Sequence, residues 1–176
     1  MLYKADLIQA YKDITRGTIL YDKIAEVDKM GFFTAPASTH YHGAYKGGLC
    51  DHSLAVTRQL LKLTESNNLF WDRKESPLIV GLFHDLCKCD QYRYDKFENE
   101  YEFVEKTMVK GHGEKSVLLA STLVQLTMEE ALCIRYHMGA FAGKEEWDGF
   151  TKAVQKYHNV LWTHQADMIA TNVEGV

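Results

Sequence analysis

The chain has 176 residues, of which 46% are apolar and 25% charged, with two prolines and a formal net charge of −4. This balance excludes a disordered or fibrous protein, and the length favours a single domain over residues 1–176. The negative charge argues against a long nucleic acid held mainly through its phosphates, because such binding needs a broad surface of lysine and arginine. A small phosphorylated ligand needs only a local positive site, which bound metal ions can supply.

Residues 1–17 mix charged and apolar side chains and lack the apolar core of a signal peptide or a membrane span. We therefore expect a cytoplasmic protein without a membrane partner. The four cysteines contain no CxxC pair, so neither a zinc ribbon nor a disulfide framework is indicated, and we expect reduced thiols.

The periodicity of apolar residues predicts a mostly helical protein. Two short amphipathic helices are expected over residues 2–13 and 19–29, followed by a loop over residues 31–48 that is rich in glycine, threonine and serine. Loops of this length inside a compact domain tend to be functional. A further helix over residues 49–65 should place His52 on its apolar side.

The next helix is indicated by Ser76 as N-cap and Pro77 as first helical residue, and it should continue through LIVGLFHDLCK as a buried central helix. Residues 91–106 alternate around a polar turn at 98–100 and predict a small β-hairpin. Helices should follow over residues 113–126, 128–138 and 148–171, the second starting with a capping box of Thr127 and Glu130. The expected fold is all-α, a helical bundle with one hairpin inserted.

The chemistry of the chain centres on histidine and aspartate. His84 and Asp85 are adjacent at the end of an apolar helix, where burying two hydrated groups is costly without partners. Four more candidates lie on other predicted helices, which a bundle can bring together: His52, His112, His137 and Asp167. Such nitrogen and oxygen ligands suit Mn, Fe, Co, Ni or Zn. Six of them with one bridging carboxylate suit two ions about 3.5 to 4 Å apart, while four suffice for one ion.

The order of His52, His84-Asp85 and Asp167 resembles the defining motif of the HD-domain metal-dependent phosphohydrolases. The runs YKGGLCDHSLAV and GLFHDLCK resemble the segments around the family's first histidine and its HDxxK element, and GHGEKS and IRYHMG resemble the extra histidine segments of its two-metal branches. The likeness is closest to the HD domain of YhaM-type 3′-5′ exoribonucleases and related small bacterial or phage hydrolases. These 176 residues include no counterpart of the separate nucleic-acid-binding domain that the YhaM type has. We therefore expect this chain to share the metal site of the YhaM-type enzymes, and we do not extend their substrate to it.

The resemblance implies an HD-domain bundle that hydrolyses a phosphate ester or anhydride of a small nucleotide-like substrate through a metal-bound hydroxide. Asp85 would bridge two ions as the catalytic carboxylate, and Lys88 would contact the substrate phosphate and offset its charge. The implied ligands are, for the first ion, His52, His84, Asp85 and Asp167 and, for the second, His112 and His137.

Weaker substrate-binding candidates are His42, which precedes the GGL segment, and Lys115, which shares a helix face with His112. The aromatic residues of the hairpin either stack a nucleobase or cap the core. Two other functions stay open, a 3′-5′ exonuclease on short RNA or DNA, which a basic, aromatic-lined groove would favour, and a non-catalytic nucleotide-binding module. The sequence makes no prediction of metal identity, base preference or oligomeric state.

Overall fold

The computed structural model describes residues 3–98, 100–104, 109 and 111–176. Over these residues the chain is mostly helical with a two-stranded hairpin, which confirms the predicted fold class. The helices are α1 (Lys4–Thr15), α2 (Ile24–Met30), α3 (Gly48–Ser66), α4 (Ser76–Phe83), α5 (His112–Leu123), α6 (Met128–Arg135), α7 (Trp147–Lys156) and α8 (Asn159–Ile169). The strands are β1 (Tyr92–Asp95) and β2 (Glu100–Phe103).

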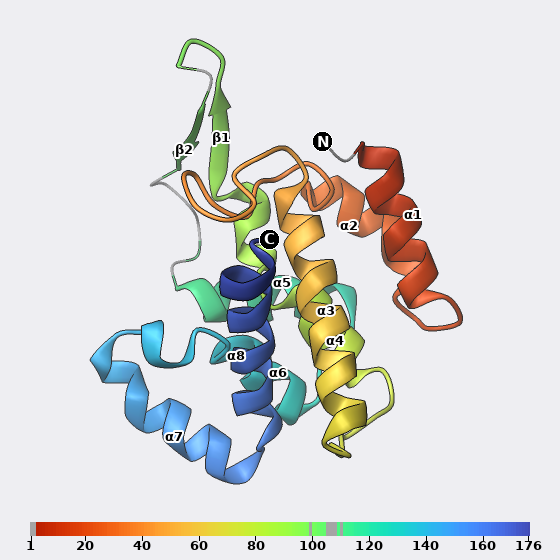
Figure 1. Ribbon diagram of the computed structural model, residues 1–176, viewed down its shortest axis with the longest axis vertical. Helices are drawn as coiled ribbons and strands as arrows, with labels where there is room; N and C mark the ends of the chain where they lie inside the picture. The colour runs from red at the N-terminus through yellow and green to blue at the C-terminus, as the bar shows by residue number, and fades with distance from the viewer. Residues whose placement is uncertain (1–2, 99, 105–108, 110) are drawn as a thin grey trace.

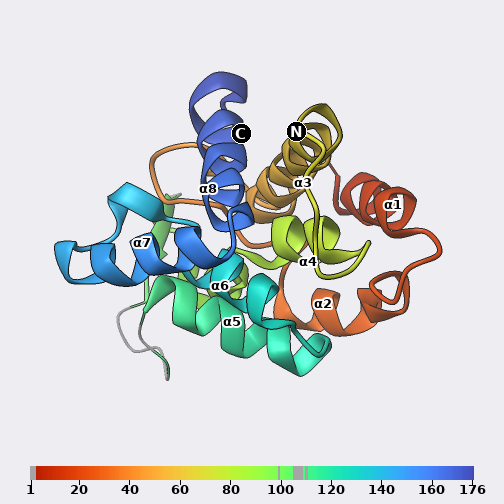
Figure 2. The same cartoon turned by 90° about the horizontal axis from the view of Figure 1, so that it is seen from below.

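The centre of the bundle is formed by α3, α4, α6 and α8 (Figure 1). Helix α3 packs against both α4 and α8, and α6 packs against α8 and α5. Helices α1 and α2 lie on one flank and α7 on the other (Figure 2). The hairpin projects from one end of the bundle, beside the loop that joins α2 to α3. Among the described residues, no helix combines the length and apolar content that crossing a membrane requires.

Helix α4 is buried at the centre, as predicted, because its apolar side chains point in all directions. Gly81 allows α4 to approach α3 closely, since a Cβ at this position would lie 2.5 Å from Thr57 Oγ1. The predicted cap is wrong by one residue: Glu75 is the N-cap and Ser76 is already helical. The Ser76 hydroxyl instead donates to Glu130 Oε1 at 2.8 Å.

The predicted continuation of α4 to Lys88 is also wrong. The helix ends at Phe83, His84 is its C-cap, and a 3₁₀ turn, η2 (Leu86–Asp90), follows Asp85. Asp85 has φ −112° and ψ 20°, outside helical values, and its carboxylate is bound by Lys88 and His112. These two contacts give the physical reason for the break, because they hold Asp85 on a path that a continuous helix does not follow.

The predicted single helix over residues 148–171 is two helices. The break falls at Tyr157, which has φ −133° and ψ 97°. Asn159, at the start of α8, donates to the Phe70 carbonyl at 2.7 Å and to Glu129 Oε1 at 2.9 Å. These bonds fix α8 in the bundle while α7 turns away to the flank. A π-helical turn (Ala170–Glu174) extends α8.

Other predicted elements hold with small shifts. The helix expected over 19–29 is a 3₁₀ turn (Tyr21–Lys23) followed by α2. Gly31 is the C-cap of α2 and has a positive φ of 96°. The capping box is confirmed by hydrogen bonds of 3.2 and 2.9 Å between Thr127 and Glu130. In the hairpin, Tyr94 pairs with Tyr101 and Tyr92 with Phe103. Three residues of the predicted hairpin lie outside the described residues. They are Asn99 in the turn and residues 105 and 106 at the end of the predicted range.

Candidate metal centre

The six predicted ligands converge on one cluster. They come from α3, the end of α4, the start of α5, the turn after α6, and α8. Within the described part of the chain their side-chain atoms form three overlapping groups, each with its atoms within 4.8 Å of one another. The groups are His52, His84 and Asp85; His84, His137 and Asp167; and Asp85, His112 and His137.

Three of the imidazoles are oriented by the backbone. The Nδ1 atom of His52 lies 2.9 Å from the Val176 backbone oxygen, that of His84 lies 2.9 Å from the Gly81 carbonyl, and that of His137 lies 2.7 Å from the Ile134 carbonyl. Such backbone oxygens only accept hydrogen bonds, so Nδ1 carries the proton in each ring. In the neutral imidazole, Nε2 is then left with a lone pair that points into the cluster.

These lone pairs have no donor to satisfy them. His52 Nε2 and His84 Nε2 lie 3.2 Å apart, and burial lowers the pKa of His84 to about 3, so its ring is neutral. His137 Nε2 is buried and lacks a hydrogen-bond partner among the described residues. Burial alone would lower the pKa of His137, but the Asp85 carboxylate, 3.3 Å from Nε2, raises it. Each facing nitrogen is an acceptor when its ring is neutral, so a metal cation between the rings satisfies nitrogens that the protein leaves unpaired. The residues present therefore suit a metal ion.

Asp85 divides its carboxylate between two halves of the cluster. Its Oδ2 atom lies 3.7 Å from His52 Nε2 and 3.5 Å from His84 Nε2. Its Oδ1 atom lies 2.7 Å from His112 Nε2 and 3.3 Å from His137 Nε2. Burial alone would raise the pKa of Asp85, but the Lys88 ammonium group, 2.6 Å from Oδ2, holds it well below its usual range. The ionised carboxylate thus faces both histidine pairs, as a bridging ligand must.

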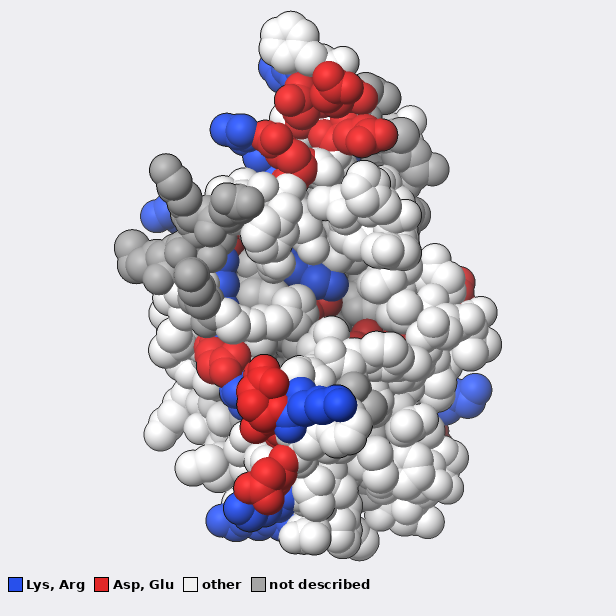
Figure 3. Space-filling model, turned by 90° about the vertical axis from the view of Figure 1, so that its left-hand side faces the viewer, with Lys and Arg blue, Asp and Glu red and all other residues white. Residues whose placement is uncertain are grey.

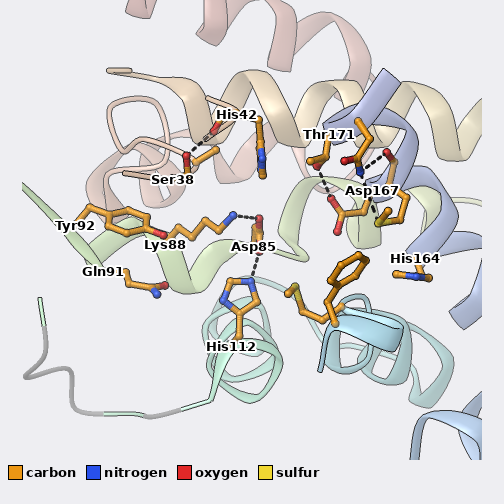
Figure 4. A pocket seen from close by; sticks show the side chains of 15 residues that line it. Ser38, His42, Asp85, Lys88, Gln91, Tyr92, His112, His164, Asp167 and Thr171 are labelled. Atoms are coloured by element: carbon orange, nitrogen blue, oxygen red, sulfur yellow. Dashed lines mark hydrogen bonds and ion pairs between the residues drawn. The ribbon is translucent and has the colours of Figure 1, made fainter. Parts of the chain in front are cut away.

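A cavity of about 370 Å³ opens over the cluster. Figure 3 shows its mouth as a hollow with basic and acidic side chains at the floor, and Figure 4 shows the side chains that line it. Lys88 lies at one side, beside Tyr92 and Gln91. His42 reaches the cavity from the loop after α2, with its ring 5.0 Å from that of His52. Burial and the nearby His52 lower the pKa of His42 to about 4, so His42 is neutral at pH 7.

Lys115 does not join these residues. Its side chain is buried at the start of α5, where its ammonium group pairs with Asp90. It is not among the residues that line the cavity. The shared helix face with His112, on which its substrate role was predicted, places it near that ligand but outside the space that a substrate can enter.

Part of the cavity wall was not predicted. It includes the apolar side chains of Met138, Phe141 and Met168 and the amide of Asn172. The available signal was proximity in sequence, because Met138 follows His137 and Met168 follows Asp167. His164, expected in the core or in support of a ligand, lines the same wall and its Nδ1 lies 2.9 Å from the His137 carbonyl.

The four cysteines are free thiols, as expected. Cys87 is buried and its Sγ lies 3.2 Å from His112 Nδ1, so this thiol contacts the ring of a predicted ligand. The cluster as a whole offers nitrogen and carboxylate donors without a thiolate, a set typical of divalent transition metals.

The chain matches no family model, and no curated protein or solved structure shows significant similarity to it.

Proposed function

We propose that the chain is a metal-dependent phosphohydrolase of the HD type, acting on a phosphate ester or anhydride of a small nucleotide-like substrate. The observation that carries the proposal is the divided carboxylate of Asp85, which faces one histidine pair with each oxygen. A carboxylate between two ligand sets is typical of two-metal hydrolases. We propose that the ions are divalent and belong to the set Mn, Fe, Co, Ni and Zn, which nitrogen and carboxylate ligands suit.

The protein's own residues would divide the work. The ligands His52, His84, Asp85 and Asp167 would hold one ion, and His112 and His137 the other with Asp85 shared. When bound, such ions supply Lewis acidity that lowers the pKa of a water and offsets charge on a phosphoryl group. The Nδ1 bonds to backbone oxygens keep the imidazoles of His52, His84 and His137 in the tautomer that a metal ligand needs.

Lys88 is the residue that we assign to the substrate phosphate. It lines the cavity with its side chain only 10% exposed, and Asp85 raises its pKa although burial opposes this, so the ammonium group stays charged. A charged donor in a partly closed site stabilises negative charge more strongly than one in water. His42, which also lines the cavity and is neutral, would donate or accept a hydrogen bond without adding charge.

The cavity volume of about 370 Å³ favours a small substrate, since sites for small molecules occupy about 300 to 1,000 Å³. The net charge of −4 provides no general attraction for a long polyanion. Mononucleotides, nucleoside polyphosphates and short phosphodiesters are therefore the substrates to examine.

The test is a hydrolysis screen with metal-reconstituted protein over ribonucleotides, deoxyribonucleotides, cyclic nucleotides and short oligonucleotides, with Asp85→Ala as control. We expect turnover of a small nucleotide that depends on added metal and is absent in the control. A higher specificity constant for a 20-mer than for any mononucleotide would establish the exonuclease instead. Metal and nucleotide binding without any turnover would identify a binding module.

A further inference from the structure

A second cavity lies beside the metal centre, between the loop after α2 and the hairpin. Its volume is about 720 Å³, and its walls include Tyr45 and Lys46 from the loop and Tyr94, Glu100 and Tyr101 from the hairpin. We call it the tyrosine groove, after Tyr45, Tyr94 and Tyr101. Figure 1 shows the two elements that form it, with the loop lying beside the base of the hairpin.

The tyrosine groove and the metal cavity are built on the same two elements. On β1, Tyr92 lines the metal cavity and Tyr94 lines the groove. Side chains two residues apart on a strand share a face and lie about 7 Å apart. On the loop, Ser38 lines the metal cavity and Thr39 lines the groove. The two cavities are therefore neighbours, close enough for one ligand to enter both.

The aromatic walls of the groove are held in place before any ligand binds. Tyr94 and Tyr101 are paired across the hairpin, with ring centroids 5.2 Å apart at 61°. The Tyr45 hydroxyl donates to Asp51 Oδ2 at 2.5 Å, which fixes the orientation of its ring on the other wall. Flat aromatic surfaces that are already ordered bind planar ligands with little further loss of entropy.

The charged residues of the groove indicate which part of a nucleotide it accepts. Glu100 contributes a carboxylate, which repels a phosphate and accepts hydrogen bonds from an exocyclic amino group. Among the described residues that line the groove, one lysine, Lys46, offsets that charge. The positive charge of Lys88 and three of the predicted ligands, Asp85, His112 and Asp167, lie in the other cavity. Phosphate is thus favoured in the metal cavity, and an uncharged ring that carries an amino group is favoured in the groove.

We propose that the tyrosine groove is a nucleobase-binding subsite of the same active site, selective for bases that carry an amino group. The base would stack on Tyr101 and donate to Glu100, while the phosphate of the same ligand lies at the metal cluster. This proposal rests on the proposed function and adds to it the part of the substrate that the protein recognises.

The test uses 2-aminopurine riboside, a fluorescent nucleoside that carries an amino group and has no phosphate bond to hydrolyse. Its quenching is titrated with full-length, metal-loaded protein. Loss of a stacking partner should weaken binding by about ten- to a hundredfold in Tyr101→Ala. Tyr101→Leu, which keeps apolar volume on the strand, should show the same loss if stacking is responsible. Phe97→Ala is the matched control, because Phe97 is on the same hairpin but 98% exposed and outside the groove.

Two further measurements isolate the roles of base and phosphate. Glu100→Gln should weaken binding of 2-aminopurine riboside more than binding of purine riboside, which lacks the amino group. Inorganic phosphate should bind Tyr101→Ala as it binds the wild type. Equal nucleoside binding by wild type and both Tyr101 variants would overturn the subsite even if the protein hydrolyses nucleotides. Binding that depends on Tyr101 in a protein without turnover would keep the subsite and reject the hydrolase.

Discussion

Asp167 Oδ1 lies 3.2 Å from His52 Nε2 although the two residues come from different helices, α8 and α3. His52 Nδ1 donates to the Val176 backbone oxygen, so its Nε2 has no proton in the neutral ring. Two lone pairs at this distance require a cation between them, either a proton or a metal ion. Metal and protons therefore compete for the same position.

The first prediction follows from this competition. Adding Mn, Co, Ni or Zn to metal-depleted protein should raise the melting temperature, and a ligand at a hundred times its dissociation constant stabilises by about 2.7 kcal/mol. The increase should shrink as the pH is lowered, because protons displace the metal from the imidazoles. Thermal unfolding at several pH values measures it. A melting temperature that is insensitive to all of these metals would contradict a metal centre.

Asp85→Asn should abolish hydrolysis and also destabilise the fold. Asp85 is the partner of Lys88, which is 8% exposed, and leaving a buried charge unpaired costs about 3 kcal/mol. Adding Lys88→Met should recover most of that loss without restoring turnover. Urea unfolding of the single and double variants, together with activity, separates the two effects. Hydrolysis by folded Asp85→Asn would contradict the proposal that Asp85 bridges two ions.

Replacing His112 and His137 by alanine should reduce bound metal from about two ions to about one per chain, since both residues lie against Oδ1 of Asp85, the half of the carboxylate proposed to hold the second ion. Activity should fall much further than metal content, because one ion cannot perform both tasks of a two-metal site. Elemental analysis of the purified double variant decides between the two numbers. One ion in the wild type and no change on mutation would leave these histidines a structural or substrate-binding role.

Lys88→Met should lower kcat/KM by about 10² to 10³ while metal content stays constant, because the residue supplies a charged donor in the cavity. Lys115→Met is a suitable comparison, since Lys115 is a buried lysine that pairs with Asp90 outside the cavity. Steady-state kinetics on a nucleotide substrate should show the large loss only for Lys88. Equal losses in both variants would indicate a general effect of removing a lysine.

Glu130→Ala should lower the free energy of unfolding by about 3 kcal/mol. Glu130 is fully buried and accepts two hydrogen bonds of 2.7 Å from Arg73, so its removal leaves that guanidinium without its carboxylate. It also completes the cap of α6. Asp148→Ala breaks an exposed pair with Lys152 and should leave the free energy of unfolding unchanged within error. Denaturant titration of both variants provides the comparison.

The helical fold was predictable because it depends on local patterns. The six-residue cluster was predictable because its members lie on different predicted helices of a bundle and because their order resembles the HD-domain motif. Apolar periodicity identifies α3 and α4, and buried hydrated groups such as His84 and Asp85 require partners. The helix breaks were not predictable in this way. Neither the segment around His84 nor that around Tyr157 contains a proline, and both breaks are set by contacts with distant residues, His112 in one case and Phe70 in the other.

The cavity walls were hidden for the same reason. Phe141 and Asn172 line one cavity only because the segment after α6 and the turn after α8 border the same space in the fold, which no local pattern encodes. For Lys115 the local pattern led to a wrong prediction. A shared helix face identifies neighbours on the same helix, but it does not identify the partner of a side chain on another element, which for Lys115 is Asp90.

The cluster draws its ligands from α3, the end of α4, α5, the turn after α6, and α8. A bound ion would act as a crosslink between segments distant in sequence, closing long loops that the unfolded chain would otherwise leave open. Fraying of one end of the chain would remove at most one ligand, and the ion would stay bound by the others. Removal of the ion would then loosen the bundle as a whole rather than one segment, which faster amide hydrogen exchange in α3, α5 and α8 together would report.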